Sequence, residues 1–550
     1  MCNKLRSKVL FTMLITAMTT GVLTGCGNNG QGASDETLAS AGTTEGIKST
    51  ESEEGDGSKA EVITLDVAYK KNTLTKDLKE NPVFQQVEEE VGVDIQWTYY
   101  GDTDWDDQRA LLLASGDLPE VMFGDGFRAE DIMNSIEYFV PLEDYIEEYC
   151  PNIKAAFEKN PEMKKRVTAT DGHIYYLPNR QPCMPNTQDA YFINQKWLDN
   201  LGLEMPTTTD ELYNVLKAFK EQDANGNGDP DDEIPITAQA TQGRGYDLIE
   251  GYLPFFGLID NMSEHKVMVK DGKVSYTAID EGLKEAVKFF HKLYQEGILD
   301  QEAFTQDYSM MQAKFQNIGD CIVGMGTAWV PSAIVSSEHL DEYTTLLPVK
   351  GPQNTTYVRY NPEIYNVADV QFSITQECKN PVAAMKWADA LYDEEISIQT
   401  FFGPEGLCVE KTDDNKYQVL EPQDGLSGDI WTWTNAPKSN GPKYVSEETE
   451  SKIILPDTSN EAVKLKINEQ YQPYISEEYY PRFMFNEDVV DQIVGYKADM
   501  EPYRDEQIAN WIVGGGVEEE WDAYVEKMNQ LGAQEYVQIL QEEYDHYYGK

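Results

Sequence analysis

Hydrophobic and polar positions alternate with two different periods along the chain after residue 61. Short apolar runs typical of strands occupy residues 62–69, 93–99, 120–123 and 321–326. Amphipathic segments with helical spacing occur among them, most clearly at 210–220 and 282–296. Strands that alternate with helices in this way predict an α/β protein whose lobes are mainly parallel sheets flanked by helices.

The segment from residue 209 to 220 shows the local chemistry of a helix. Leu212, Leu216 and Phe219 recur at helical spacing. One of the three threonines at 207–209 is expected to cap the N-terminus of this helix, ahead of an acidic first turn.

Composition and length divide the chain into a tether and folded lobes. Residues 27–60 consist largely of Gly, Ser, Thr and Glu, which cannot bury enough apolar surface to offset the entropy lost on ordering. No comparable break follows in the 550-residue chain. The remainder exceeds the roughly 250–300 residues at which a single core stops growing. We therefore expect a flexible tether followed by at least two lobes.

The N-terminus has the features of an export signal. Basic residues precede an apolar stretch at 9–23, and the following LTGC resembles the lipobox of bacterial lipoproteins. This pattern predicts cleavage after residue 25 and a lipid on Cys26. An ordinary secretory signal with an incidental cysteine, or an uncleaved anchor, is the alternative. No later stretch reaches the roughly 18 consecutive apolar residues of a membrane span.

Charge and cysteine spacing exclude two classes of function. The net charge of −53 argues against binding nucleic acid, whose phosphates require neutralisation by Lys and Arg. The cysteines beyond Cys26 are widely spaced and contain no CxxC pair, so neither a disulfide scaffold nor a thiolate zinc site is indicated. They are Cys150, Cys183, Cys321, Cys378 and Cys408. One pair can bridge, but the odd number leaves at least one free thiol.

An acidic loop at 223–233 resembles the first half of an EF-hand. Calcium prefers several oxygen ligands, and an EF-type loop places them at alternating positions before a final bidentate Glu. Here Ile234 occupies the place of that Glu, and the loop leads from a helix into a strand-like run at 233–236 instead of a second helix. The candidate ligands of a structural Ca²⁺ are Asp223, Asn225, Asn227, Asp229, Asp231, Asp232 and Glu233. An Asn-Gly turn without an ion is the alternative.

The motifs of common enzymes are absent. The sequence contains no GxSxG, HExxH or GxxxxGK[ST], and its one GxGxxG falls at the lipobox, outside any βαβ unit. Carboxylates are so abundant that no acid–base pair can be singled out. We therefore expect a protein that is not an enzyme.

Aromatic residues supply candidates for sugar binding. The chain has 33 Tyr, 9 Trp and 19 Phe, and flat rings with polar handles suit the C–H faces and hydroxyls of sugars. Those at probable strand ends or loops are Tyr69, Trp105, Trp329, Tyr360, Trp431 and Trp433. For each one alone, core packing or an ordinary surface position is the better explanation. Together they favour a sugar-binding cleft between lobes.

Several longer stretches together resemble the lipoprotein substrate-binding proteins of ABC carbohydrate importers from Gram-positive bacteria, extracellular solute-binding protein family 1. The resemblance spans residues 61–548 and is carried by segments 111–123, 171–178, 196–235, 288–304 and 511–532. The most specific is KWLDNLGLEMPTTTDELYNVLKAFKEQDANGNGDPDDEIP at 196–235.

The resemblance implies a two-lobed periplasmic-binding-protein-like type II fold with the ligand cleft between the lobes. The expected segments are a signal peptide at 1–25, the lipidated tether at 26–60, an N-lobe at 61–185 that returns at 351–430, a C-lobe at 186–350 and C-terminal helices on the C-lobe at 431–550.

The resemblance also implies roles for particular residues. Trp329 matches a sugar-stacking Trp, Asp125 matches a residue that hydrogen-bonds a sugar hydroxyl, and Tyr69 matches a cleft-facing position. The loop at 223–233 matches a calcium motif of the family, although an extra acidic residue leaves open which of Asp231, Asp232 and Glu233 takes the last positions.

The function implied is an extracellular, lipid-anchored monomer that captures an oligosaccharide by lobe closure and delivers it to the permease subunits of an ABC transporter. A secreted glycosidase or lyase, or a sugar-sensing lipoprotein of a two-component system, is the alternative. Which sugar is bound does not follow from the sequence.

Overall fold

The computed structural model describes most of the chain beyond the N-terminal segment. Its described residues are 62–101, 105–169, 171–187, 189–239, 248–260, 265–360, 367–423, 426, 428–482 and 485–549. Cys26 and the segments expected at 1–25 and 26–60 lie outside them. In the described residues no helix combines the length and the apolar character needed to cross a membrane.

A mixed six-stranded sheet forms the centre of the first lobe, in the order β13-β4-β10-β3-β1-β2. Its strands are β1 (Ile63–Lys70), β2 (Val93–Tyr100), β3 (Val121–Phe123), β4 (Tyr176–Arg180), β10 (Val367–Ile374) and β13 (Lys443–Tyr444). β1 runs parallel to β2 and β3, whereas β10 is antiparallel to its neighbours β3 and β4. The carboxyl ends of β1 and β3 therefore meet at one edge of the sheet.

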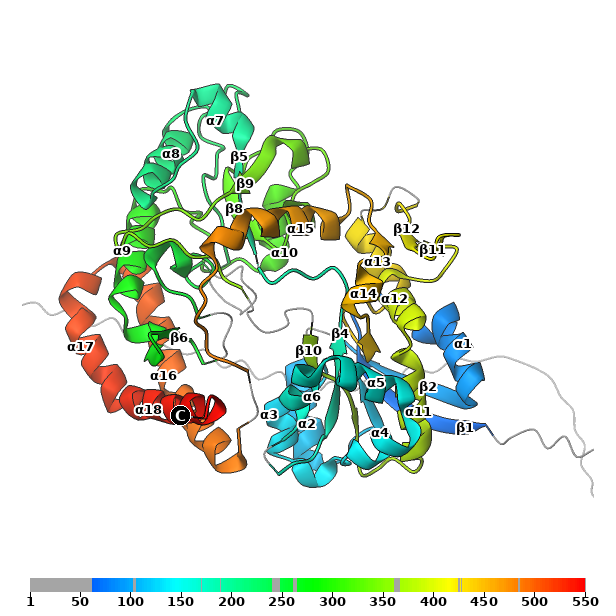
Figure 1. Ribbon diagram of the computed structural model, residues 1–550. Coiled ribbons are helices and arrows are strands. Elements are labelled where there is room, and N and C mark those ends of the chain that lie inside the picture. The colour runs from blue at the N-terminus through cyan, green and yellow to red at the C-terminus, as the bar shows by residue number, and fades with distance from the viewer. Residues whose placement is uncertain are drawn as a thin grey trace, which may run out of the picture. The chain divides into compact units, whose positions relative to one another are not determined.

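Helices surround this sheet (Figure 1). They are α1 (Pro82–Val91), α2 (Trp105–Ser115), α3 (Ala129–Met133), α4 (Glu143–Tyr149), α5 (Pro151–Lys159), α6 (Pro161–Val167), α11 (Pro381–Leu391) and α12 (Glu394–Phe402). α1 packs on α11 and β2, and α6 packs on β4 and β10. Prolines at the first turns of α1, α5, α6 and α11 suit these helix starts, where the backbone N–H has no helical partner.

The second lobe contains a three-stranded sheet in the order β8-β5-β9 and a hairpin. The strands are β5 (Ala190–Asn194), β8 (Met325–Ala328), β9 (Tyr343–Leu346), β6 (Val267–Lys270) and β7 (Lys273–Tyr276). Its helices are α7 (Gln195–Leu201), α8 (Thr209–Glu221), α9 (Glu281–Gln295) and α10 (Tyr308–Phe315), followed late in the chain by α15 (Asn460–Tyr471), α16 (Glu487–Gly514), α17 (Val517–Gln530) and α18 (Ala533–Tyr547).

Smaller elements complete the described fold. A third sheet consists of β11 (Val409–Lys411), β12 (Tyr417–Val419) and β14 (Ile453–Ile454), and short helices α13 (Gly428–Asn435) and α14 (Glu447–Glu450) lie between its strands in the chain. The 3-10 turns are η1 (Leu78–Glu80), η2 (Ile136–Tyr138), η3 (Leu253–Phe256), η4 (Thr277–Ile279), η5 (Pro331–Ala333), η6 (Leu340–Glu342) and η7 (Gln472–Tyr474).

Two large hydrophobic cores define the lobes. The core of the first lobe draws on residues between 65 and 177 and again between 367 and 396, with Tyr444 from β13. The core of the second lobe draws on 190–358 and then on 467–544, where Trp511, Trp521 and Tyr524 of the last helices pack. Each lobe is thus assembled from segments distant in sequence. The lobe boundaries predicted from the sequence, with an N-lobe at 61–185 and 351–430 and a C-lobe at 186–350, remain a prediction.

The predicted elements agree with the structure where the pattern is long and periodic. The runs at 62–69 and 93–99 form β1 and β2, and the segments at 210–220 and 282–296 form α8 and α9. Thr208 caps α8, because its hydroxyl accepts a hydrogen bond from the backbone N–H of Glu211 at 3.1 Å. The fold is a mixed α/β architecture, as expected.

Three details differ from the sequence-based expectation. The run at 321–326 yields a strand only from Met325, and the segment at 233–236 makes isolated parallel bridges at Ile234 and Ile236 instead of a strand. The strands β8, β5 and β9 are paired antiparallel, not parallel. Short strands buried on both faces give no hydrophobic alternation, so their pattern does not reveal their direction.

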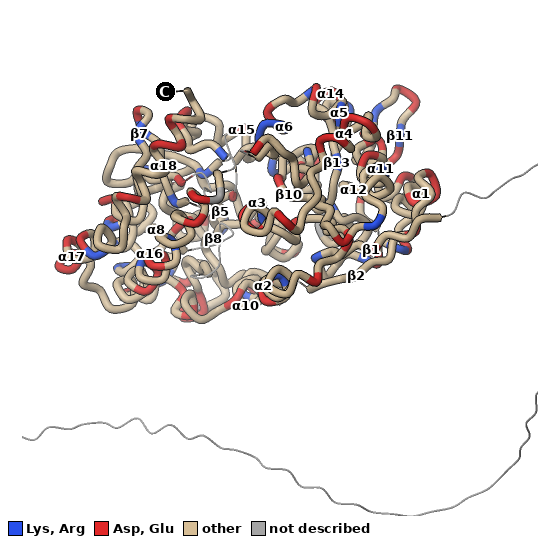
Figure 2. Tube along the Cα trace, turned by 90° about the horizontal axis from the view of Figure 1, so that it is seen from below, with Lys and Arg blue, Asp and Glu red and all other residues tan. Residues whose placement is uncertain are grey.

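Acidic residues are distributed over both lobes (Figure 2). The first turn of α17, for example, holds Glu518, Glu519 and Glu520, which favour the positive end of the helix dipole. The structure therefore spreads the negative charge over solvated elements.

Candidate functional site

The short segment 438–441 brings predicted site residues of both lobes together. The Lys438 ammonium lies 5.8 Å from the ring centroid of Trp329 and 5.8 Å from that of Trp433. It also forms a 3.4 Å ion pair with Glu461, which lies near the start of α15. We call Trp329, Trp433, Lys438 and Glu461 the Lys438 cluster.

The aromatic members of this cluster come from different elements. Trp329 directly follows β8 of the second lobe, as the sequence predicts, and Trp433 lies on α13. Both side chains are half-buried. The indole nitrogen of Trp329 is buried without a hydrogen-bond partner among the described residues. Two partly accessible indoles beside a cation and a carboxylate can stack on apolar ligand faces and exchange hydrogen bonds with hydroxyl groups.

The other end of the segment reaches the carboxyl edge of β1 and β3. The side-chain amide of Asn440 donates to the Tyr69 hydroxyl at 3.2 Å. Next to Tyr69, Lys70 forms a 3.6 Å ion pair with Asp125, which follows β3. The Asp125 side chain is 44% exposed and can accept a further hydrogen bond, whereas Tyr69 is fully buried beneath this edge.

Buried polar side chains hold the backbone of segment 438–441. The Asn179 amide donates to the carbonyls of Ser439 at 2.7 Å and Gly441 at 3.0 Å, and Gln371 accepts from the Gly441 N–H at 2.9 Å. Gly441 has φ 87°, and a Cβ there would lie 2.0 Å from the Phe123 ring. Only glycine therefore fits, and the backbone lies directly on the first-lobe core.

Lys443 adds an unusual anchor to this segment. Its ammonium donates to the carbonyls of Asn440 and Gly441, and the residue is 1% exposed. No ion pair of Lys443 occurs among the described residues. Burial consequently lowers the pKa of Lys443 to about 7, because the charged form loses its hydration.

The remaining aromatic candidates are buried. Trp105 is 3% exposed, and its indole donates to the Gly126 carbonyl at 2.7 Å within the first-lobe core. Tyr360 is 2% exposed and its hydroxyl donates to the Ser476 carbonyl, and Trp431 on α13 is 7% exposed. In this conformation these rings serve as packing, and their role in ligand binding stays a prediction.

The acidic loop at 223–233 lies between α8 and the bridge at Ile234. Its acceptors converge through internal hydrogen bonds: the Asn225 and Asn227 amides donate to the Asp232 carboxylate at 3.0 and 2.8 Å. Glu233 is 2% exposed and accepts from the backbone N–H of Ala224 at 2.8 Å. Burial raises the pKa of Glu233 despite these backbone bonds.

Two carboxylate oxygens of this loop fit a cation. Asp223 Oδ1 and Glu233 Oε2 are buried without a hydrogen-bond partner among the described residues. Unpaired buried carboxylate oxygens are costly unless a proton or a cation satisfies them. Asp229 and Asp231 are exposed. Asp320, which the sequence did not single out, lies 3.4 Å from the Asn227 amide.

Sequence reasoning missed the residues that organise the site. Lys438, Asn440, Lys443 and Glu461 have no motif of their own. The only local signal is the turn chemistry of PKSNGPK at 437–443, in which Pro, Asn and Gly mark a loop. That signal identifies a turn but not the two indoles that it faces.

Comparison with known proteins assigns the family. A model of bacterial extracellular solute-binding proteins matches residues 70–397. The chain belongs to this family, whose members bind solutes and are not enzymes. It is 34% identical to the fructooligosaccharide ABC transporter substrate-binding protein FusA of Streptococcus pneumoniae serotype 4 over 492 residues, which cover 86% of this chain and 88% of FusA.

Solved structures agree with this assignment. The complex of S. pneumoniae FusA with kestose has a TM-score of 0.80 at 32% identity, over 88% of this chain and 99% of that chain. A FusA EF-hand mutant in complex with fructo-nystose has a TM-score of 0.79 at 33% identity, over 88% and 99% of the two chains.

A further relative by sequence is the Bacillus subtilis lipoprotein LipO. It is 24% identical over 72% of this chain and 78% of its own length.

The unusual burial of Lys443 predicts a specific pH dependence of stability. Folding lowers the Lys443 pKa from 10.5 to about 7, so the unfolded chain binds this proton more tightly. The loss of folding free energy caused by burying the charged Lys443 has its full value below about pH 7 and disappears as the pH rises towards 10.5. The melting temperature of Lys443→Met, relative to that of the native protein, should therefore fall as the pH rises through this window.

Differential scanning calorimetry of both proteins across that pH range measures this difference. Lys416→Met is the matched control, because Lys416 is exposed. A difference for Lys443→Met that stays constant with pH contradicts the assignment.

Proposed function

We propose that this solute-binding protein captures an oligosaccharide for an ABC importer, with fructo-oligosaccharides as its ligand class. The observation that carries this proposal is the Lys438 cluster, which places two half-buried indoles and a cation at a point where segments of both lobes meet. The names of the FusA relative and of its kestose and fructo-nystose complexes supply the ligand class.

The chemistry of the cluster suits a sugar. Trp329 and Trp433 offer flat apolar faces for the C–H faces of pyranose or furanose rings. Lys438 donates and Glu461 accepts hydrogen bonds, and outside the cluster Asp125 after β3 is a further acceptor, so together they select a pattern of hydroxyl groups. A ligand held by residues of both lobes stabilises the conformation in which these residues lie close, which is a population shift towards lobe closure.

Delivery to a transporter follows from the same relatives. FusA is named as an ABC transporter substrate-binding protein, and a closed, ligand-loaded form is the state that a permease has to distinguish from the empty one. Contact with permease subunits and a monomeric state remain predictions.

Binding of kestose to the purified mature protein tests the ligand site. Trp433→Ala and Trp329→Ala should each weaken binding about two- to tenfold, since one aromatic stack contributes roughly 0.5–1.5 kcal/mol. Isothermal titration calorimetry measures the Kd, and mass spectrometry of the recovered sugar measures its integrity. Tyr548→Ala, which removes an exposed tyrosine near the end of α18, is the control.

An unchanged Kd in both tryptophan variants removes the Lys438 cluster from the ligand site. Recovery of shortened sugars with new reducing ends indicates a glycosidase instead of a binding protein.

A structural Ca²⁺ in the loop at 223–233 is part of this proposal. Asp223 Oδ1 and Glu233 Oε2 lack partners among the described residues, and the neighbouring amide and carboxylate groups are already ordered. Asp223, Asn225, Asn227, Asp232 and Glu233 supply oxygen ligands of the kind that Ca²⁺ prefers. A FusA EF-hand mutant among the similar structures supports an ion site in such relatives. Asp229 and Asp231 are further ligand candidates.

Removal of Ca²⁺ should lower the melting temperature without changing the sugar that is bound. Saturation at 100 times the Kd adds about 2.7 kcal/mol to the free energy of unfolding. Asp223→Asn should abolish this response to a chelator, whereas Asp413→Asn, at an exposed turn between β11 and β12, should retain it. Calorimetry with and without EDTA measures the change in melting temperature. If EDTA lowers the melting temperature of Asp223→Asn as much as that of the native protein, the metal assignment is wrong.

Lipid anchoring at Cys26 places the protein on the outer face of the cytoplasmic membrane. The support is the LTGC sequence and the similarity to LipO, which is named as a lipoprotein. Two acyl chains give stable anchoring, whereas one gives marginal binding.

Cell fractionation measures this anchoring. Cys26→Ser should shift the protein from the membrane fraction to the medium or the unprocessed precursor, whereas Cys378→Ser should leave its distribution unchanged. Retention of a mature, membrane-bound Cys26→Ser protein argues against the lipid.

A further inference from the structure

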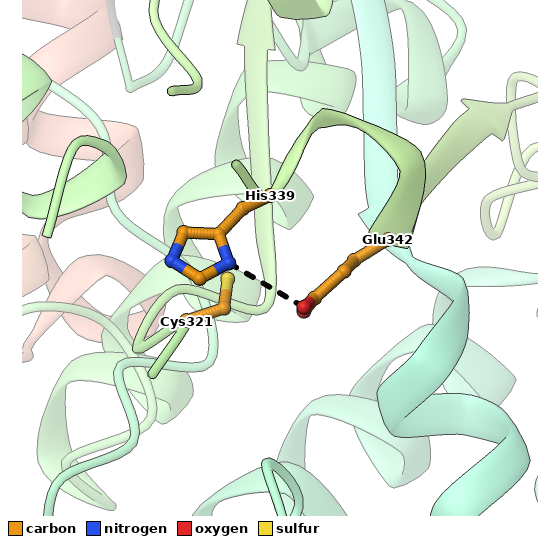
Figure 3. Close-up of side chains that lie close together, drawn as sticks. All are labelled: Cys321, His339 and Glu342. Carbon is orange, nitrogen blue, oxygen red and sulfur yellow. Dashed lines mark hydrogen bonds and ion pairs between the residues drawn. The ribbon is translucent and has the colours of Figure 1, made fainter. Parts of the chain in front are cut away.

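A buried cluster of three metal-binding residue types lies at one end of the second-lobe sheet. The liganding atoms of Cys321, His339 and Glu342 all lie within 4.8 Å of one another. Figure 3 shows the His339 imidazole facing both the Cys321 thiol and the Glu342 carboxylate. Cys321 is 5% and His339 is 3% exposed, and the Glu342 side chain is 13% exposed.

The strand pairing explains why residues so far apart meet. His339 is the N-cap of η6 and Glu342 is its last residue, immediately before β9. Cys321 lies in the turn before β8. β5 runs between the two strands, and its last residue, Asn194, pairs with Tyr343 of β9 and donates its N–H to the Gly324 carbonyl at 2.7 Å. The two ligand-bearing turns are therefore fixed to the same end of β5.

Protein hydrogen bonds do not account for the buried imidazole. His339 Nδ1 lies 3.4 Å from Glu342 Oε1, which is a long contact, and His339 Nε2 is buried with no partner among the described residues. A neutral imidazole requires a donor and an acceptor for its two nitrogens. In Figure 3 the nitrogen that faces Cys321 and Glu342 is Nδ1, whereas Nε2 points away from them, so an ion in the cluster would bind Nδ1 in place of its long contact with Glu342.

Surrounding donors orient the prospective ligands. The Asn194 amide donates to Cys321 Sγ at 3.3 Å and to Glu342 Oε2 at 3.4 Å. The Lys196 ammonium contacts Glu342 Oε1 at 2.9 Å, and the Tyr343 hydroxyl lies 3.0 Å from Cys321 Sγ. Such outer partners are typical of metal sites, where they fix the orientation of ligand side chains.

We infer that Cys321, His339 and Glu342 bind a divalent transition-metal ion of the zinc type. Thiolate and imidazole favour Zn²⁺ over Ca²⁺, which prefers oxygen ligands alone. Tetrahedral bonds of about 2.0–2.3 Å place ligand atoms about 3.3–3.8 Å apart, so small side-chain rotations close the observed cluster around the ion. The Cys321 thiol loses its proton on binding, and a water completes the coordination.

The expected role is structural. The ion cross-links the segment before β8 to the turn before β9, at the end of the sheet opposite to the one from which Trp329 extends. Its ligand types differ from those of the neighbouring oxygen-rich loop at 223–233, which suit Ca²⁺.

Metal titration of the mature protein tests this site. The protein is stripped with a chelator, Ca²⁺ is restored in excess, and Co²⁺ or Zn²⁺ is added. Co²⁺ should give a thiolate-to-cobalt charge-transfer band, Zn²⁺ should displace it at one equivalent, and Zn²⁺ should raise the melting temperature. Cys321→Ser and His339→Asn should abolish the band and weaken Zn²⁺ binding by about 100-fold or more.

Matched controls separate this site from others on the chain. Cys378 is a partly exposed thiol of the first lobe, and His173 is an exposed imidazole paired with Glu143. Cys378→Ser and His173→Asn should keep the band and the Zn²⁺ affinity. Loss of the band in either control, or its absence in the native protein, overturns the proposal and leaves an ordinary hydrogen-bonded cluster.

A measurement on the native protein covers the case in which a variant does not fold. Zn²⁺ should slow the alkylation of Cys321 at least about tenfold, and should not slow that of Cys378, as mapped by mass spectrometry of peptides. Equal rates with and without Zn²⁺ overturn the site regardless of how the variants behave.

Discussion

The candidate site depends on the anchoring of one short backbone segment, 438–441, to the edge of the first-lobe sheet. Its carbonyl and N–H groups are satisfied by buried Asn179, Gln371 and Lys443, and Gly441 lies against the Phe123 ring. Each of these groups would be costly to bury alone, but together they specify one backbone path. Because the path is fixed, Lys438 emerges beside Trp433 and Trp329, and Asn440 reaches Tyr69.

The second lobe positions Trp329, its residue in the Lys438 cluster, through β8, the strand that Trp329 follows. The turn before β8 is held on one side by the acidic loop, since Ile234 exchanges backbone hydrogen bonds with Ile322 and Gly324 at 2.8 and 2.9 Å. On the other side, the group of Cys321, His339 and Glu342 joins this turn to β5 and η6. An ion at either place would stiffen the same strand. Metal binding far from the ligand would then act by limiting the positions available to Trp329.

Local chemistry made part of this fold predictable. α8 follows from its apolar spacing and its threonine cap, and β1 and β2 follow from long β-branched runs. Trp329 and Asp125 could be nominated because the family resemblance assigns a role to each of these positions after a strand. Strand direction in the second lobe could not be read, because buried strands as short as β5 and β8 present the same pattern in either direction. The burial of Trp105, Tyr360 and Trp431 could not be predicted either. An aromatic residue beside a turn has the same sequence pattern whether its ring faces a ligand or packs in a core.

The sequence by itself therefore predicted the export signal, and it determined the α/β class, the oxygen-rich loop and the membership of a binding-protein family, because each depends on residues that are close together in the chain. Only the tertiary structure decided that Lys438 lies between two indoles, and that Cys321 lies beside His339 and Glu342 although no CxxC spacing is present. These groupings depend on which distant segments the two cores bring into contact. Burial then changes the chemistry of the groups, as for Lys443, whose pKa is set by the absence of water and not by its neighbours in sequence.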